Sequence, residues 1–384
     1  MAGYSSSSTQ LHIDFFRASV APSLGPHPRC TGAPTIWKSF MTDDHTPVEV
    51  SWCWSTSLAT PTVRYSVEPI GRLAGQADDP INTAASNKLL GETLPLAPDL
   101  DLYLHRHFRR ALTSQNAVAI DKTGAAAIPL SQTFMAFDLL EATVVAKQYY
   151  LPGWRALEEA KTKFSVVVDA VRNLPPSASS LLGLFDVFVE FLESLPEETR
   201  PTVEILAIDC LDPVQSRVKI YVRSRETTFK SVTEMLTLGG RAPKTQEETE
   251  ALRGLWCAVF GLDEGTCEDN QPLPENDHLT GGMLYYYELK CGTAVPKTKI
   301  YLPVRHYAQD DDQIARGLSL YLDQRGKRLT TGSYYDGVQR LCKHRTLASG
   351  LGFHTYISWA SENGKWNVTA YFNPQIYHSS RGAA

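Results

Sequence analysis

A short motif recurs along this chain at nearly constant intervals and constrains its fold more than any other feature. Its copies are Lys147-Gln-Tyr149, Lys219-Ile-Tyr221 and Lys299-Ile-Tyr301, followed by Thr369-Ala-Tyr371, which keeps the tyrosine alone. The tyrosines are 72, 80 and 70 residues apart, and a near-constant period indicates an internal repeat. In a β-strand, residues i and i+2 face the same side, so each lysine projects together with its tyrosine. In an earlier segment, Arg64 takes the lysine position and Ser66 the tyrosine position.

Each copy lies in the second of two segments that alternate apolar and polar residues and are rich in Val, Ile, Thr and Tyr. This pattern is typical of paired β-strands. Five pairs predict ten strands, at 47–54 with 62–70, 131–138 with 142–151, 202–210 with 216–224, 280–290 with 297–304, and 352–360 with 365–373.

Between the pairs, Leu, Phe and Val recur at helical spacing among charged residues. Asp99, Ser180 and Thr245 stand at N-cap positions, and Gly326 stands at a C-terminal end. The predicted helices cover 99–112, 153–174, 180–195, 245–262 and 310–325.

Ten antiparallel strands from five tandem ααββ units close most economically into one barrel, because closure removes both sheet edges. We therefore expect an α+β fold, a ten-stranded antiparallel β-barrel surrounded by helices. No linker rich in Pro, Gly and Ser divides the chain, and its one loose region, 72–98, lies between the first and second units. Residues 1–384 are thus expected to form a single domain.

Composition excludes several classes of partner. The net charge of -5 argues against a surface that collects nucleic acid. Seven scattered cysteines without a C-x-x-C pair indicate a reduced, cytoplasmic setting. Neither a signal peptide nor an apolar stretch of membrane-spanning length is present, so we expect a soluble protein that does not bind a membrane. Its expected oligomeric state is a monomer or a homodimer.

Several basic residues share the predicted inward face of the barrel. Buried cations are almost never unpaired, because desolvation costs several kcal/mol per ion. We therefore expect an anionic ligand with several charges, such as a diphosphate. The basic residues are Arg64, Lys147, Arg217, Lys219 and Lys299.

Tyrosines share that face, and aromatic rings attract cations by roughly 0.5 to 2 kcal/mol. Such a ring suits a reaction in which a diphosphate leaves an organic cation behind, and it keeps water away from that cation. The alternative, a solvated strand face, would explain one Lys-x-Tyr triplet, but three in register favour the lumen. The tyrosines are Tyr149, Tyr221, Tyr301 and Tyr371, with Tyr356 as a further candidate.

One acid is expected in the same lumen. Glu49 alternates with Val48 and Val50 in the first strand, so its side chain projects opposite the two apolar ones. There it can accept a hydrogen bond from an indole N–H and make the ring more nucleophilic. A glutamate on the outside of the strand is the alternative.

The candidates for metal binding are weaker. Asp310-Asp311-Asp312 is an acidic run of the kind that binds magnesium, but it lacks a fourth acid and stands where a helix should begin, which favours a helix-dipole role. His105 and His107 lie two apart on a predicted helix and diverge. We expect no metal site.

Together these stretches resemble the dimethylallyltryptophan synthase family of aromatic prenyltransferases, over about residues 4 to 378. The matching segments are WKSFMTDDHTPVEVSWCW, TVRYSVEPIG, VVAKQYYLP, DCLDPVQSRVKIYVRS, KTKIYLPVRHYAQDD and TYISWASENGKWNVTAYFNP. The resemblance implies the ααββ-repeat barrel called the ABBA or PT fold. It also implies that no cofactor is required, that magnesium is not essential, and that dimethylallyl diphosphate alkylates an indole by a Friedel–Crafts route. Relatives usually carry a further helical segment before AGYSSSSTQLHIDFF, so the N-terminal helical part is expected to be shortened.

The resemblance also assigns roles to residues. Glu49 is expected to bind the indole N–H, the five bases to bind the diphosphate, and the tyrosines to shield the cation. Lys147 is also a candidate to take the proton from the alkylated ring. Phe40, Met41 and Thr42 are expected near the polar end of the acceptor. Two alternatives remain: a phenolic acceptor, such as tyrosine or a hydroxyarene, and a barrel that binds a small molecule without catalysis.

Overall fold

The strands form a closed antiparallel barrel, as the sequence predicts. The computed structural model describes residues 2–27, 37–114 and 129–381. Around the barrel the strand order is β1-β10-β9-β8-β7-β6-β5-β4-β3-β2, so each strand pairs with its sequence neighbour and β1 closes on β10. The strands are β1 (Val48–Ser55), β2 (Thr62–Val67), β3 (Thr133–Leu139), β4 (Val144–Tyr150), β5 (Thr202–Asp209), β6 (Arg217–Ser224), β7 (Met283–Lys290), β8 (Lys297–Leu302), β9 (His354–Glu362) and β10 (Lys365–Phe372).

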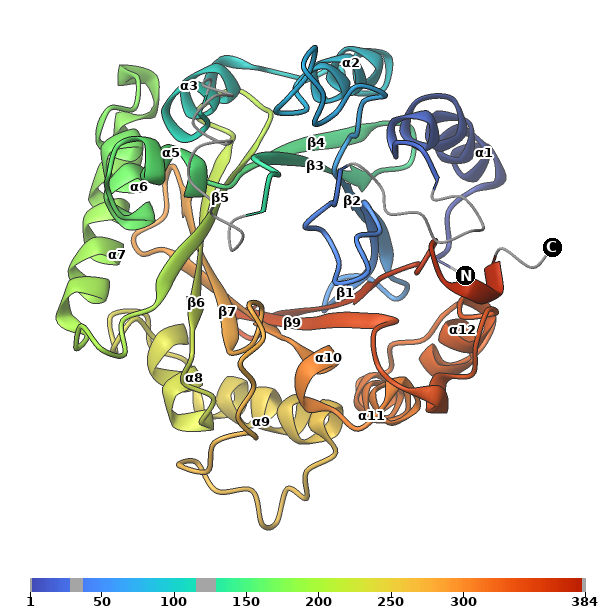
Figure 1. Ribbon diagram of the computed structural model, residues 1–384. Coiled ribbons are helices and arrows are strands. Elements are labelled where there is room, and N and C mark those ends of the chain that lie inside the picture. Colours follow the sequence, from blue (N-terminus) through green and yellow to red (C-terminus); the bar gives the residue numbers. More distant parts are fainter. Residues whose placement is uncertain (1, 28–36, 115–128, 382–384) are drawn as a thin grey trace.

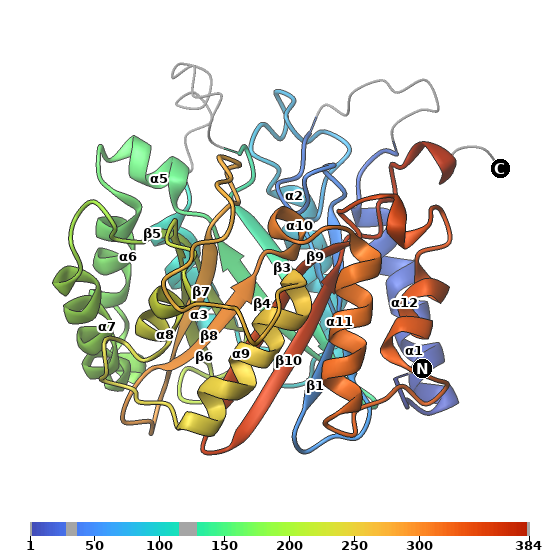
Figure 2. The same ribbon diagram turned by 90° about the horizontal axis from the view of Figure 1, so that it is seen from below.

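Alternation along the strands separates the outer core from the lumen. On β6, Val218, Ile220 and Val222 are fully buried in the large apolar core between barrel and helices, whereas Lys219 and Tyr221 face inward. Figure 1 looks along the barrel and shows the helices as an outer ring; Figure 2 shows them from the side. Apolar burial on the outer face thus holds the ring of helices to the barrel.

The helices fill the intervals between the strand pairs. They are α1 (Ser6–Phe15), α2 (Ala84–Thr93), α3 (Tyr103–Leu112), α5 (Gly153–Glu158), α6 (Lys163–Arg172), α7 (Leu182–Ser194), α8 (Phe229–Leu236), α9 (Gln246–Phe260), α10 (Val304–Tyr307), α11 (Asp311–Asp323) and α12 (Tyr334–Leu341). No helix in the described ranges is long and apolar enough to cross a membrane.

Local capping explains where the helices differ from prediction. The helix predicted at 153–174 is two helices, because Ala160 takes a left-handed conformation (φ 52°) and the Thr162 hydroxyl caps α6. Thr245 caps α9 in a capping box, as predicted. The caps predicted at Asp99 and Ser180 are wrong: α3 begins after Leu102, and Ser180 lies within a 3₁₀ turn.

Other helices lie where none was predicted. One of them, α2, lies inside the region predicted to be loose. Another, α1, packs on the barrel through Phe15, whose ring meets that of Phe137 edge to face at 5.6 Å. Their apolar positions are few or irregular, so helical periodicity did not reveal them.

Candidate active site

The five predicted basic residues share the lumen. Lys147, Lys219 and Lys299 are buried, on β4, β6 and β8, whereas Arg64 and Arg217 are partly exposed, on β2 and β6. In each of β4, β6 and β8 the tyrosine lies two residues further along, so the tyrosines form a second layer toward one end of the barrel. We call this end the mouth.

Four of these bases have counter-charges within the protein. Asp138 on β3 accepts hydrogen bonds from Lys147 Nζ at 2.6 Å to each oxygen, and lies 3.1 Å from Arg64 Nε. Asp209 on β5 pairs with Arg217 and, at 2.7 Å, with Lys219. The sequence analysis expected an anionic ligand as the partner of the bases and did not anticipate these internal carboxylates.

The pKa of each of these two carboxyls shows how strongly the bases hold it. Burial by itself would raise the pKa of Asp138, but Lys147 and Arg64 hold it well below its usual value. Burial by itself would also raise the pKa of Asp209, but Lys219 and Arg217 hold it well below its usual value. Both carboxylates are thus ionised at any physiological pH.

A repeat in the sequence marks these acids, although the sequence analysis missed it. Asp138, Asp209 and Glu288 stand near the ends of β3, β5 and β7, and are 71 and 79 residues apart. That spacing matches the tyrosine period. Glu288 lies across from Lys219 in the sheet and 3.5 Å from Arg217.

Lys299 differs from the other lysines. In the described part of the chain, no carboxylate lies within ion-pair distance of its ammonium group. Nζ instead lies 3.5 Å from Thr369 Oγ1 and 5.1 Å from the centre of the Tyr301 ring. Burial, with Arg64 and Lys147 nearby, lowers the pKa of Lys299 to about 7. Lys147 has its pKa lowered to about 8, first by burial, although Asp138 opposes the change.

The predicted tyrosines form a connected layer. Ring centres are 6.0 Å apart for Tyr149 and Tyr221, 5.8 Å for Tyr221 and Tyr301, and 5.5 Å for Tyr301 and Tyr371. Tyr356 lies 6.1 Å from Tyr301.

Two further aromatic side chains belong to this layer. Tyr286 on β7 lies 5.4 Å from Tyr221, and Phe134 on β3 stacks on Tyr149 at 4.2 Å. The sequence analysis did not name them because it followed only the second strand of each pair.

Glu49 lies at the mouth end of the lumen. It is opposite Ser66 on β2 and accepts a hydrogen bond of 2.6 Å from Thr355 Oγ1. Burial raises the pKa of Glu49 to about 7, while the Thr355 hydrogen bond and Arg305 pull it the other way. A carboxyl with such a pKa exchanges protons readily at neutral pH.

The segment before β1 is anchored to Glu68. The Glu68 carboxylate accepts hydrogen bonds from Trp37 Nε1 at 2.8 Å and from Ser39 Oγ at 2.5 Å. Phe40 therefore lies at the mouth, against Phe134, and lines a pocket there.

Met41 and Thr42, which were also predicted to lie near the acceptor, form hydrogen bonds within their own segment. The Met41 N–H donates to the Ser39 hydroxyl, and the Thr42 hydroxyl donates to the Thr46 carbonyl within its own loop.

The acidic run at the start of α11 has structural partners. Asp310 caps the helix. Asp311 is fully buried and binds Arg345, His354 Nδ1 and the backbone N–H groups of Phe353 and His354. Asp312 binds Arg316, so the three acids do not converge on one point.

The sequence profile of tryptophan dimethylallyltransferases matches residues 1–337. This chain belongs to the tryptophan dimethylallyltransferase family. It is 47% identical to 4-O-dimethylallyl-L-tyrosine synthase of Claviceps purpurea, over all of this chain and 86% of that one. It is 32% identical to 7-dimethylallyltryptophan synthase of Aspergillus fumigatus, over 95% of this chain and 80% of that one. The predicted resemblance is confirmed, and the chain is an aromatic prenyltransferase.

Solved structures share the fold of this family member. The crystal structure of AnaPT from Neosartorya fischeri superposes with a TM-score of 0.81 at 24% identity, covering 97% of this chain and 89% of that one. NotF, solved in complex with brevianamide F and DMSPP, gives 0.82 at 21% identity, covering 98% and 91%. The α+β barrel predicted from the repeat is thus the fold of known prenyltransferases.

Proposed function

We propose that this prenyltransferase moves a dimethylallyl group from its diphosphate to the phenol oxygen of a tyrosine-type acceptor. The observation that carries the proposal is Glu49, a lumen carboxyl with a pKa of about 7 at the mouth end. The 47% identity to a 4-O-dimethylallyl-L-tyrosine synthase supports the phenol. The sequence analysis put an indole first and the phenol second, and this similarity reverses the order in which we rank them.

The basic layer is proposed to bind the donor. Arg64, Lys147, Arg217, Lys219 and Lys299 offer charge and N–H donors to the diphosphate oxygens. Their combined charge takes the part that a magnesium ion plays in other diphosphate sites, so we propose that neither a metal nor a cofactor is required.

The tyrosine layer is proposed to hold the cation. The bond between the allylic carbon and the diphosphate oxygen breaks, and its electron pair leaves with the diphosphate. The dimethylallyl cation then faces the tyrosine rings, Tyr149, Tyr221, Tyr301, Tyr356 and Tyr371, whose π faces stabilise positive charge.

The acceptor step needs one base when oxygen is the nucleophile. The phenol oxygen forms the new C–O bond and its proton passes to Glu49, so the group that attacks is the group that loses the proton. Phe40 at the mouth offers an apolar contact for the acceptor. Met41 and Thr42 follow it in the chain and are proposed to lie toward the polar end of the acceptor.

The indole is the second candidate. An alkylated indole carbon must lose a proton at a different atom from the N–H that binds Glu49, which requires a second base. Lys147 is that base in the sequence analysis, and its pKa of about 8 supports the role. Its hydrogen bonds to both Asp138 oxygens favour the charged ammonium form, which cannot accept a proton.

The test is a competition assay in excess EDTA. The purified protein is incubated with dimethylallyl diphosphate and equal amounts of L-tyrosine, L-tryptophan and O-methyl-L-tyrosine, and products are identified by mass spectrometry. We expect prenylated tyrosine and no product from O-methyl-L-tyrosine, which lacks the O–H. A tryptophan product alone would establish the indole alternative. Diphosphate binding without any product would support the non-catalytic barrel.

A further inference from the structure

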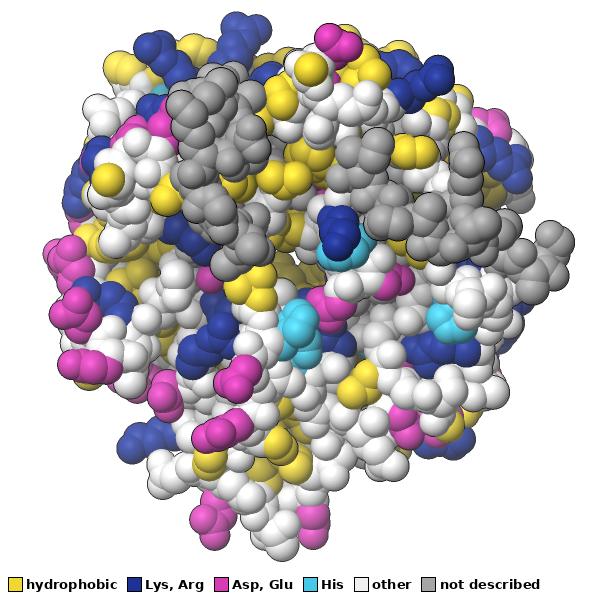
Figure 3. All heavy atoms as spheres, in the orientation of Figure 1, with side chains coloured by type: hydrophobic (Ala, Val, Ile, Leu, Met, Phe, Trp, Pro, Cys, Tyr) yellow, Lys and Arg dark blue, Asp and Glu magenta, His cyan; other side chains and the backbone are white. Residues whose placement is uncertain are grey.

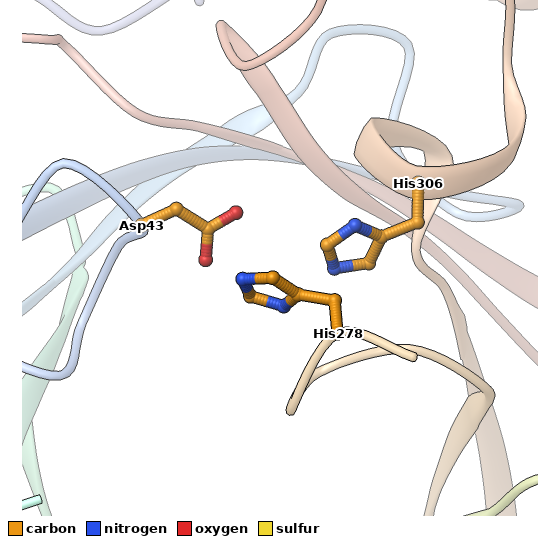
Figure 4. A group of neighbouring side chains, drawn as sticks. All are labelled: Asp43, His278 and His306. Atoms are coloured by element: carbon orange, nitrogen blue, oxygen red, sulfur yellow. The ribbon is translucent and has the colours of Figure 1, made fainter. Parts of the chain in front are cut away.

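Three segments meet at the mouth in a group of potential metal ligands. Asp43 belongs to the loop before β1, His278 to the loop before β7, and His306 to α10. One ligand atom from each lies within 4.8 Å of the other two (Figure 4). Figure 3 shows histidine, acidic and basic side chains side by side at the rim of the central hollow.

Hydrogen bonds already orient both imidazole rings. The Thr280 hydroxyl lies 2.8 Å from His278 Nδ1 and 2.7 Å from His306 Nε2. Metal-binding histidines usually bond an oxygen through the second ring nitrogen, which fixes the ring and its tautomer. His278 Nδ1 also accepts the Thr280 backbone N–H at 3.2 Å, so metal binding through Nε2 requires the ring proton to move to Nδ1, which then donates to the Thr280 hydroxyl.

The ligand set bears on the kind of ion. Two imidazoles with one carboxylate favour zinc and its neighbours in the first transition row over magnesium, which prefers oxygen ligands.

We propose that Asp43, His278 and His306 bind a divalent transition-metal ion of the zinc class, separate from the prenyl-transfer chemistry. A tetrahedral zinc with nitrogen ligands at about 2.0 Å holds its ligand atoms roughly 3.3 Å apart, so the group must contract slightly on binding. Asp43 and His278 are exposed side chains, so they can move inward once Asp43 leaves Arg305 and the His278 ring shifts on Thr280.

Arg305 opposes the ion. Its Nε lies 3.3 Å from Asp43 Oδ2 and donates at 3.2 Å to His306 Nε2, the nitrogen that also contacts Thr280, so it occupies the carboxylate and places a positive charge beside the ring. Metal binding must displace this guanidinium. We therefore expect affinity in the micromolar range, and tighter binding when the positive charge is removed.

An ion at this place affects entry to the lumen. Phe40 lines the mouth pocket together with Leu279 and Thr280, and these residues are close neighbours in sequence of Asp43 and His278. A metal bound by Asp43, His278 and His306 holds in place the two segments that line that pocket, one with Phe40 and one with Leu279 and Thr280. We expect a filled site to raise the KM for the acceptor and to leave donor affinity unchanged.

The binding test uses tag-free protein without substrates. Zinc is titrated by calorimetry, and cobalt by its visible absorption, in wild type, His278→Ala, Arg305→Gln and the control His107→Ala. His107 is on α3, bound to the Ala170 carbonyl. We expect at least tenfold weaker binding in His278→Ala, several-fold tighter binding in Arg305→Gln, and no change in the control. Equal zinc affinity in wild type and His278→Ala overturns the site.

The kinetic test asks whether the filled site restricts the mouth. Zinc should raise the acceptor KM in wild type at concentrations that saturate the site, and not in His278→Ala; equal inhibition of both would mean that zinc acts on the diphosphate substrate and would overturn the mouth effect. Because binding is measured without substrates, its outcome does not depend on whether tyrosine is the acceptor.

Discussion

Lys147 donates hydrogen bonds to both carboxylate oxygens of Asp138, each at 2.6 Å, inside the barrel. Lys219 and Arg217 share Asp209, with one carboxylate oxygen each. The lumen therefore carries internal counter-ions, and a diphosphate must compete with them. This competition reduces donor affinity but keeps the empty barrel foldable, because unpaired buried charges are strongly destabilising.

Asp138→Asn tests the competition. The substitution removes the carboxylate that inorganic diphosphate must displace, so we expect about tenfold tighter diphosphate binding. Because Asp138 also raises the pKa of Lys147, binding is measured at pH 6.5 to limit the neutral form of this lysine. The same change leaves Arg64 and Lys147 without their acid, and we expect a loss of about 3 kcal/mol in the free energy of unfolding without ligand. Calorimetry measures the diphosphate affinity, and thermal denaturation measures the loss of stability. Glu141→Gln, at an exposed position, is the control. Weaker diphosphate binding would show that Asp138 positions the bases.

The pKa of Glu49 sets the acidic limb of the activity profile. A base with a pKa of about 7 is protonated below that pH, so kcat/KM for the acceptor should fall as the pH decreases through 7. Glu49→Gln should lower turnover at least 100-fold without changing diphosphate affinity. Unchanged turnover would end the assignment of Glu49 as base.

Thr355→Val tests the same assignment without touching the carboxyl. The Thr355 hydroxyl donates to Glu49 and stabilises its anion, which lowers the pKa. Loss of this hydrogen bond should raise the pKa of Glu49 and move the acidic limb to higher pH. A pH profile identical to that of the wild type would show that another group is responsible for the limb.

Lys299 should take up a proton when diphosphate binds. With a pKa of about 7, it is roughly nine-tenths neutral at pH 8, and a bound polyanion favours the charged form. Calorimetry in two buffers of different ionisation enthalpy gives the number of protons taken up. Lys299→Gln should remove more than half of a proton from this number. An unchanged number would place the uptake on Lys147.

Asp311 is expected to matter for folding and not for metal binding. Its carboxylate is fully buried and holds Arg345, His354 and two backbone N–H groups. Asp311→Asn should lower the free energy of unfolding by about 3 to 5 kcal/mol, whereas Asp312→Asn on the exposed side of the same helix should change it by less than about 1 kcal/mol. Thermal denaturation with and without magnesium decides: stabilisation of the wild type by magnesium, absent from both variants, would revive the acidic run as a metal site.

The sequence determined the barrel and most of its inner surface. A strand has only two faces, so alternation placed Lys219 with Tyr221 and separated Glu49 from Val48 without any knowledge of neighbouring strands. The constant period then put equivalent residues at equivalent levels of the barrel. Asp138 and Asp209 are spaced by nearly the same period, so the same argument could have predicted them from the sequence.

Only the tertiary structure decided which side chains touch. Thr355 and Glu49 are 306 residues apart, and they meet because β1 closes the barrel against β10, beside β9. Asp43, His278 and His306 likewise come from two loops and one helix, whose positions depend on where the strands end. Hydrogen bonds and pKa values depend on distances of a few ångströms between such segments, whereas sequence periodicity fixes only the face and the level of each residue.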